Sequence, residues 1–181
     1  MSDVIKRHPQ SVLPQANELL DRLKRHAQSQ RDKLAAILPK LKDGDAKRGK
    51  QLFATEKAKC ATCHRVGDLG KRVGPDLTTI GANRSASDLL ESIVLPSASI
   101  VRDYDTQNIL TVDGAMVSGL LVSEDSSNVT LQQATGETVV VSADDIEQRS
   151  PHPVSIMPTG YGETLSPQQL ADLVAYLRQL R

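Results

Sequence analysis

Two cysteines are present in the 181 residues, Cys60 and Cys63, and His64 follows the second directly. Thiols and an imidazole at this spacing suit three kinds of chemistry: a redox dithiol, a metal site such as zinc, or covalent attachment of haem. A redox dithiol is expected at a strand-to-helix junction of a βαβ unit, but the residues before Cys60 have a helical pattern. A zinc site needs a fourth ligand, for which His152 or a carboxylate is the candidate, and the sequence has no second CxxC or HxxxH pair.

Covalent haem attachment uses all three side chains of this motif. CxxCH is the known attachment signature, because thiols three positions apart on a helical turn reach the two vinyl groups on one edge of the porphyrin. The adjacent His64 then ligates the iron. Gly74-Pro75 follows ten residues later, where a rigid loop is placed to offer a backbone carbonyl to the far nitrogen of His64 and to orient its ring.

A methionine is the natural sixth ligand on the other face of a haem. Met1 is the first residue and Met116 lies in a predicted hairpin, which leaves Met157, 93 residues after His64. The alternative interpretation of Met157 is a core residue that fills a gap. The other histidines are rival ligands: His152, which is the nearest rival, His8 and His26.

Hydrophobic periodicity predicts a helical chain interrupted by short strands. The expected helices cover about 12–27, 31–38, 46–55, 86–94 and 166–180. The expected strands cover about 104–112, 115–123, 128–133 and 137–141. Asp113-Gly114 between the first two strands is a strong hairpin signal, so we expect an antiparallel meander of about four strands. Gly49 and Phe53 lie one helical turn apart, a small residue beside a large one, which favours a close crossing with the last helix.

The composition excludes some classes of function. Lysine plus arginine equals aspartate plus glutamate, 22 each, so no overall charge favours nucleic acid. No apolar run is long enough to span a membrane, and the first 30 residues lack the apolar centre of a signal peptide.

Residues 1–50 carry 12 basic and 6 acidic side chains, and residues 101–150 carry 2 basic and 9 acidic ones. This uneven charge is either ordinary solvated surface or, on the acidic segment, a docking surface for a basic partner. With three tyrosines, one phenylalanine and no tryptophan, the core is aliphatic or is filled by a group that is not an amino acid.

Several motifs follow one another in the order found in class I cytochromes c. They are GKQLF (49–53), CATCH (60–64), GPDL (74–77), SIMP (155–158) and LADLVAYLRQL (170–180). The sequence therefore resembles this family over roughly residues 43–181. More narrowly, it resembles the haem-binding domain at the C-terminus of large secreted proteins of planctomycetes and verrucomicrobia, on residues 74–100, Tyr104, 113–124 and 155–177. In that domain a β insertion precedes the methionine loop.

The resemblance implies a mainly α fold, the class I cytochrome c fold, with a small antiparallel β-meander insertion and an N-terminal helical arm. The arm is residues 1–42, the cytochrome c domain is residues 43–181, and the insertion is at about 101–149. The resemblance also implies a role for each site residue. Cys60 and Cys63 anchor one haem c, His64 is the proximal ligand, the carbonyl of Pro75 orients His64, and Met157 is the distal ligand. Gly49, Phe53 and Tyr176 make the crossing of the first and last helices of the domain.

The implied function is one-electron transfer through haem iron, without bond chemistry, so the chain is not expected to be an enzyme. The implied partners are redox proteins, including a fused or separate dehydrogenase of the sugar-dehydrogenase-like type. Haem is attached outside the cytoplasmic membrane, so a periplasmic or other extracytoplasmic location is expected. The alternative function is a haem-based sensor or ligand-binding module with a labile sixth ligand.

Overall fold

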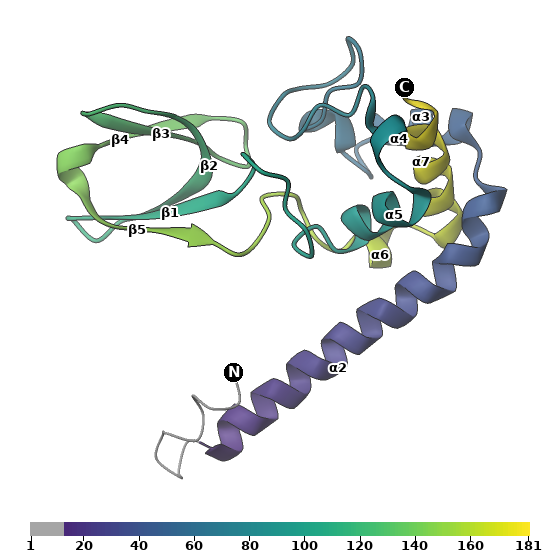
Figure 1. Cartoon of the computed structure of the whole chain (residues 1–181), viewed down its shortest axis with the longest axis horizontal. Helices are drawn as coiled ribbons and strands as arrows, with labels where there is room; N and C mark the ends of the chain where they lie inside the picture. Colours follow the sequence, from purple (N-terminus) through teal and green to yellow (C-terminus); the bar gives the residue numbers. More distant parts are fainter. Residues whose placement is uncertain (1–12) are drawn as a thin grey trace.

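The computed structural model describes residues 13–181 (Figure 1). Residues 1–12, which include His8, lie outside the described residues. The helices, with η for 3₁₀ helices, are α2 Leu13–Ile37, η2 Leu38–Asp43, α3 Ala46–Phe53, η3 Cys60–Thr62, α4 Ile80–Asn83, α5 Ala86–Val94, η4 Ala143–Asp145, α6 Tyr161–Thr164 and α7 Pro167–Gln179. The strands are β1 Thr106–Thr111, β2 Met116–Glu124, β3 Asn128–Gln132, β4 Thr138–Ser142 and β5 Ile146–His152.

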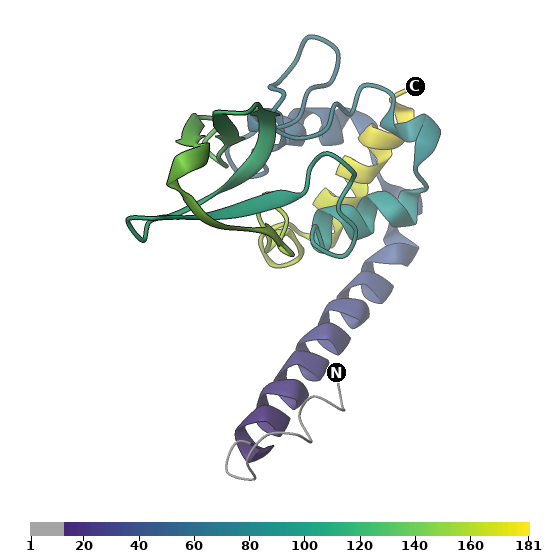
Figure 2. The ribbon, with the colours of Figure 1, turned by 60° about the vertical axis from the view of Figure 1, so that its left-hand side comes forward.

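Helix α2 projects away from the rest of the molecule in both views (Figures 1 and 2). The sequence predicts two helices in this region, but one helix of 25 residues forms, because Gln28-Ser29-Gln30 contains no glycine or proline to interrupt it. At its C-terminal end Ile37 is only 4% exposed, whereas Leu23 in the middle is 53% exposed. The arm is therefore anchored at one end. Within residues 13–181 no helix has the length and apolarity needed to cross a membrane.

Helices α3 and α7 pack closely at the centre of the helical part (Figure 1). A Cβ atom at Gly49 would lie 1.9 Å from the backbone carbonyl oxygen of Asp172, so the two helices approach here only because residue 49 is glycine. One turn later the ring of Phe53 packs edge-on against Tyr176, with ring centroids 5.7 Å apart. The predicted crossing of these two helices is confirmed.

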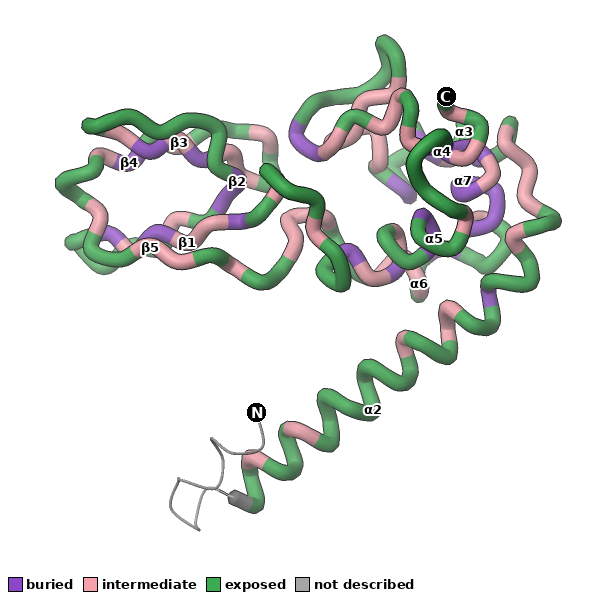
Figure 3. The backbone as a smooth tube through the Cα atoms, viewed as in Figure 1, coloured by how far each residue is buried: buried purple, intermediate pink, exposed green. Residues whose placement is uncertain are grey.

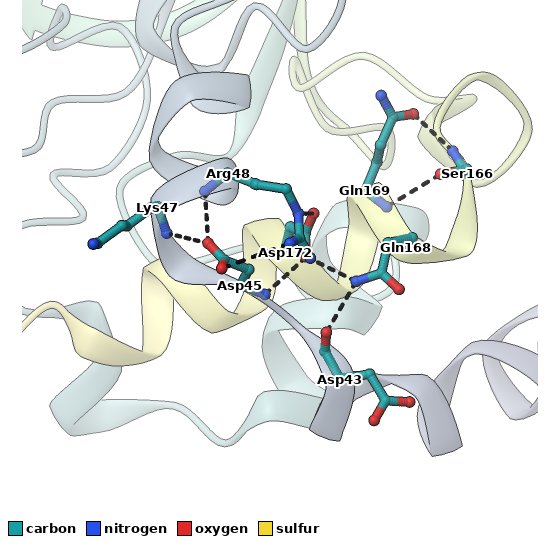
Figure 4. Close-up of polar contacts among 8 residues, drawn as sticks. All are labelled: Asp43, Asp45, Lys47, Arg48, Ser166, Gln168, Gln169 and Asp172. Carbon is teal, nitrogen blue, oxygen red and sulfur yellow. Dashed lines mark hydrogen bonds and ion pairs between the residues drawn. The ribbon is translucent and has the colours of Figure 1, made fainter.

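A polar network joins the start of α3 to α7 (Figure 4). The carboxylate of Asp45 caps α3 by accepting hydrogen bonds from the backbone N–H groups of Lys47 and Arg48. The buried carboxylate of Asp172 accepts two hydrogen bonds of 2.7 Å from the Arg48 guanidinium, and further bonds from the N–H of Asp45 and the amide of Gln168. Burial acts to raise the pKa of Asp172, but these donors outweigh it, so the pKa lies below its ordinary value.

The five strands form one antiparallel sheet in the order β4-β3-β2-β1-β5. Hydrophobic periodicity predicts the first four strands but not β5, which extends beyond position 149 to His152. Its residues are mostly polar and include Pro151, a composition that only an edge strand tolerates, because one side of an edge needs no backbone partner. β5 pairs with β1 as far as Thr106↔His152. The pairing of β5 with β1 therefore brings together the start and the end of the insertion, where the chain leaves and re-enters the helical part.

The buried side chains form two separate groups (Figure 3). The larger group lies in the helical part and includes Phe53, Leu90, Leu170, Leu173 and Val174. The smaller group lies within the sheet and consists of Ile109, Val129, Leu131 and Val141. The prediction of a mainly α chain is therefore corrected: the fold is mixed, since the sheet has five strands and its own core.

Candidate functional site

Cys60, Cys63 and His64 lie on a tight turn a few residues after α3. The turn begins at Lys59, whose φ of 52° is left-handed, and continues as η3. The backbone N–H groups of Cys63 and His64 both donate to the carbonyl oxygen of Cys60, at 3.2 and 2.8 Å. This folding brings all three side chains into the wall of one cavity.

The ring of His64 is fixed by the loop that follows it. Its Nδ1 atom lies 2.8 Å from the carbonyl oxygen of Pro75. Because a carbonyl only accepts, Nδ1 carries the proton, and Nε2 keeps its lone pair for a metal ion. Burial lowers the pKa of His64, and the hydrogen bond to Pro75 opposes this only in part. The imidazole is therefore neutral at neutral pH, the form in which histidine ligates metals.

Gly74 provides the space that the His64 ring needs. A Cβ atom at this position would lie 2.7 Å from Cε1 and 3.0 Å from Nδ1 of the ring. The backbone N–H groups of Val73 and Gly74 donate to the carbonyl oxygen of Cys63, at 3.0 and 2.8 Å. The loop is thus tied to the cysteine turn, and a side chain at residue 74 would displace the imidazole.

The two cysteines are not bonded to each other. Burial raises the pKa of the Cys60 thiol to about 11. A redox dithiol depends on a cysteine whose pKa is lowered, often at a helix N-terminus, so the environment of Cys60 opposes that chemistry. Covalent attachment of a group through sulfur does not require a lowered pKa of the Cys60 thiol in the folded protein.

The cavity has a volume of about 470 Å³, within the usual range for a small-molecule site. All five residues that the sequence analysis assigns to the site line it: Cys60, Cys63, His64, Pro75 and Met157. Most of the remaining wall is apolar, and it includes Val73, Leu77, Ile80, Leu89, Pro96, Ile100, Val101 and Ile156. Tyr104 and Ala134 contribute from the two sides of the β insertion, Tyr104 just before β1 and Ala134 in the turn between β3 and β4.

Met157 lies in the connection between β5 and α6. Its backbone N–H donates to the hydroxyl oxygen of Ser155 at 3.2 Å. The N–H of Ser155 donates in turn to the hydroxyl of Ser97, at 3.0 Å, which lies just after α5. These bonds hold the methionine segment against the helical part, although the five strands separate it in sequence from His64.

The rival ligand His152 has a different environment. It is the last residue of β5 and pairs with Thr106, and the side-chain amide of Asn108 lies 3.1 Å from its Nδ1. Among the described residues that line the cavity, Met157 is present and His152 is not. Within residues 13–181, no group of three histidine, cysteine, aspartate or glutamate side chains is arranged to hold a metal ion. His26 lies exposed on α2, far along the chain from the cysteine turn.

The sequence gives no role to three residues at or beside the cavity: Ala134 and Tyr161, which line it, and Ser97, which does not. Ser97 acts from beside the wall, through its bond to Ser155. The hydroxyl of Tyr161 donates to the carbonyl oxygen of Ala58 at 2.9 Å. Aromatic residues are rare in this chain, and this rarity is the sequence signal that could have drawn attention to Tyr161.

Comparison with protein families finds a match within the chain. Residues 46–130 match the model of the family described as Cytochrome c. No curated protein matches the chain. The matched segment contains the cysteine turn and the Pro75 loop but ends before Met157, so the match supports a cytochrome c domain, and the methionine side of the cavity is an independent observation.

Proposed function

We propose that the chain is a c-type cytochrome that carries one haem, bound covalently through Cys60 and Cys63, with His64 and Met157 as axial ligands. The observation that carries the proposal is the convergence of these four side chains on one apolar cavity, from segments 93 residues apart in sequence. The match to the cytochrome c family supports haem binding and electron transfer in general. The individual ligands are part of the proposal.

The residues present fit a haem group. Two thiols, a neutral imidazole with a free Nε2 and a thioether are the donors that a covalent haem with histidine and methionine ligation requires. The His64 ring is accommodated only because residue 74 is glycine. The carbonyl oxygen of Pro75 accepts a hydrogen bond from the Nδ1–H group of His64. This bond orients the ring and makes Nε2 a stronger ligand.

When bound, haem c supplies an iron that gains and loses one electron. The side chains of this protein hold the group and set its environment, and none is needed to make or break a bond in a substrate. The apolar wall excludes water, and a methionine ligand raises the reduction potential. An apolar pocket of this kind also accounts for a core with so few aromatic side chains.

The finer parts of the proposal follow from the resemblance. Residues 43–181 form the cytochrome c domain, interrupted by the β insertion, and residues 1–42 form the arm. The domain is of the planctomycete and verrucomicrobial type, works outside the cytoplasmic membrane, and accepts electrons from a fused or partner dehydrogenase. Its partners are redox proteins that exchange electrons with the haem.

Absorption spectroscopy tests the proposal. The chain is produced in a host with haem-maturation machinery and directed outside the cytoplasmic membrane. We expect a low-spin, six-coordinate spectrum with the ferric near-infrared band of methionine ligation. Met157→Ala should abolish this band, and the matched variant His152→Ala should retain it.

Three outcomes contradict the proposal in different ways. A wild-type spectrum that is high-spin, with ready binding of carbon monoxide, favours the sensor alternative. Loss of the band in His152→Ala with retention in Met157→Ala reassigns the sixth ligand. A colourless protein that contains zinc removes the haem assignment altogether.

A further inference from the structure

The segment that carries Met157 joins two parts of the fold. It runs from the end of β5 at His152 to the start of α6 at Tyr161, and between them the chain has no helix or strand. A ligand in such a segment binds iron well only if the segment is held at a fixed distance from the haem. The bond from Ser155 to Ser97 restrains it on the side of the sheet.

Tyr161 restrains the same segment on its other side. Its hydroxyl donates to the carbonyl oxygen of Ala58 at 2.9 Å. Ala58 is fully buried and lies two residues before Cys60, so the bond connects positions 103 residues apart in sequence. Burial, together with the nearby Cys60 and Cys63, raises the pKa of Tyr161, so the hydroxyl remains protonated and able to donate at neutral pH.

The carbonyl oxygen of Ala58 has a second neighbour. The thiol of Cys60 lies 3.6 Å from it, in the position of a weak sulfur donor. A cysteine converted to a thioether has no S–H group to donate. Once Cys60 is attached to haem, the Tyr161 hydroxyl is the donor that remains for this buried carbonyl, so attachment increases the importance of the tyrosine bond.

We propose, on the basis of the function proposed above, that Tyr161 is a positioning residue for the sixth ligand: its bond to Ala58 ties the Met157 segment to the haem-attachment turn. The two ligands of the iron are then held by one continuous piece of structure. His64 is fixed through Pro75 on the side of the attachment turn that follows the cysteines, and Met157 is fixed through Tyr161 and Ala58 on the side that precedes them. Tyr161 does not touch the reacting atom and acts only through the segment.

The test is Tyr161→Phe in the haem-loaded chain, which removes the hydroxyl and keeps the ring. Carbon monoxide binding to the ferrous protein reports how often Met157 leaves the sixth position. We expect its rate to rise about fivefold, the effect of losing one ordinary hydrogen bond. The ferric near-infrared band should disappear at a lower temperature than in the wild type. Tyr161→Leu, which also removes the ring, should enlarge both effects.

Tyr176→Phe is the matched control, because Tyr176 is buried at the crossing of α3 and α7 and does not line the cavity. Its carbon monoxide rate and its near-infrared band should equal those of the wild type. Equal rates in Tyr161→Phe and the wild type would overturn the inference while the proposed function stands. A wild type without the band, in contrast, would overturn the proposed function and the role of Tyr161 with it. A fall in global stability with an unchanged carbon monoxide rate would assign Tyr161 a merely structural role.

Discussion

The helical part and the β insertion contribute to the cavity in different ways. The helical part is held together by contacts between residues far apart in sequence, such as Gly49 against Asp172 and Phe53 against Tyr176. The insertion is built from neighbouring hairpins around a small core of its own. The helical part therefore depends on close long-range contacts, above all at Gly49, whereas the insertion is a local structure that is joined to the site at its base.

The insertion nevertheless contacts the cavity directly. Ala134, in the turn between β3 and β4, lines the wall. In the same turn, a Cβ atom at Gly136 would lie 3.4 Å from the side chain of Val73, the neighbour of Gly74. We expect changes in the helical part to decide whether the site forms, and changes in the insertion to adjust its properties.

The largest effect is expected at the crossing of α3 and α7. In Gly49→Ala the new methyl group would lie 1.9 Å from the backbone of Asp172, which cannot move without separating the helices. We expect a loss of more than about 4 kcal/mol in the free energy of unfolding and little haem incorporation. Urea denaturation and haem yield measure these effects.

Gly114→Ala is the comparison in the insertion. Gly114 has a φ of 87°, but no atom lies within 4 Å of its Cβ position, so the cost is limited to backbone strain. We expect a loss of about 1 kcal/mol and an unchanged haem spectrum. Equal losses in the two variants would remove the distinction between the two parts of the molecule.

The second effect concerns the buried carboxylate of Asp172, whose side chain is 6% exposed. Asp172→Asn replaces an acceptor of four hydrogen bonds and leaves the Arg48 guanidinium without its charged partner, so we expect a loss of about 2–3 kcal/mol. Because the pKa of Asp172 is lowered by folding, its contribution is present above the pKa of an unfolded aspartate, near 4, and is lost as the pH falls through the folded value.

Unfolding measured between pH 7 and pH 3 separates this effect from others. The wild type should lose stability more steeply than Asp172→Asn below about pH 4, so the two curves should converge. Parallel curves would show that the carboxylate does not supply the expected charge interaction. Asp144→Asn, at an exposed position of the insertion, is the control.

The sequence predicts well what depends on local chemistry. Helices α3 and α7 begin within one residue of the expected starts at 46 and 166, because the short polar side chains of Asp45 and Ser166 satisfy free N–H groups of the first turn. The turns at Gly114 and Gly136 have the positive φ values that glycine favours. The CxxCH motif and Gly74-Pro75 predict the orientation of His64, since the two residues of that contact lie only 11 positions apart in sequence.

The sequence does not predict contacts that arise only when distant segments meet. The bond from Tyr161 to Ala58 joins residues 103 positions apart, and nothing in the sequence around either residue indicates that the two meet. Strand β5 is missed because its stability comes from backbone pairing with β1, not from apolar alternation. The same pairing explains why His152, a plausible ligand on spacing alone, is held in the sheet.

The third prediction places a charge in the part of the wall that the insertion supplies. In Ala134→Asp the carboxylate favours ferric over ferrous iron, so we expect the reduction potential to fall by about 30–60 mV. The haem spectrum and methionine ligation should remain. Redox titration measures the shift, and Ala134→Asn controls for polarity without charge. An unchanged potential in Ala134→Asp would mean that this turn does not shield the haem.

The fourth prediction concerns the base of the insertion. Thr106 pairs with His152 and is 5% exposed, and within the described residues its hydroxyl has no hydrogen-bond partner. Thr106→Val removes this unsatisfied group at nearly constant volume. We expect a gain of about 1 kcal/mol in the free energy of unfolding, with an unchanged potential. A loss of stability or a shifted potential would show that the hydroxyl has a partner when haem is bound.

The smallest effect is expected far from the cavity, on the acidic end of the insertion. Asp144, Asp145 and Glu147 are exposed near the turn between β1 and β2, and a basic redox partner would be attracted to them. Replacing all three with their amides should slow electron transfer to such a partner a few-fold at low salt and leave the rate at high salt unchanged. The matched control replaces three acidic residues of α2: Glu18, Asp21 and Asp32. Because both variants change the net charge equally, a slower rate in the first alone would locate docking on the insertion, whereas equal rates would attribute any effect to net charge.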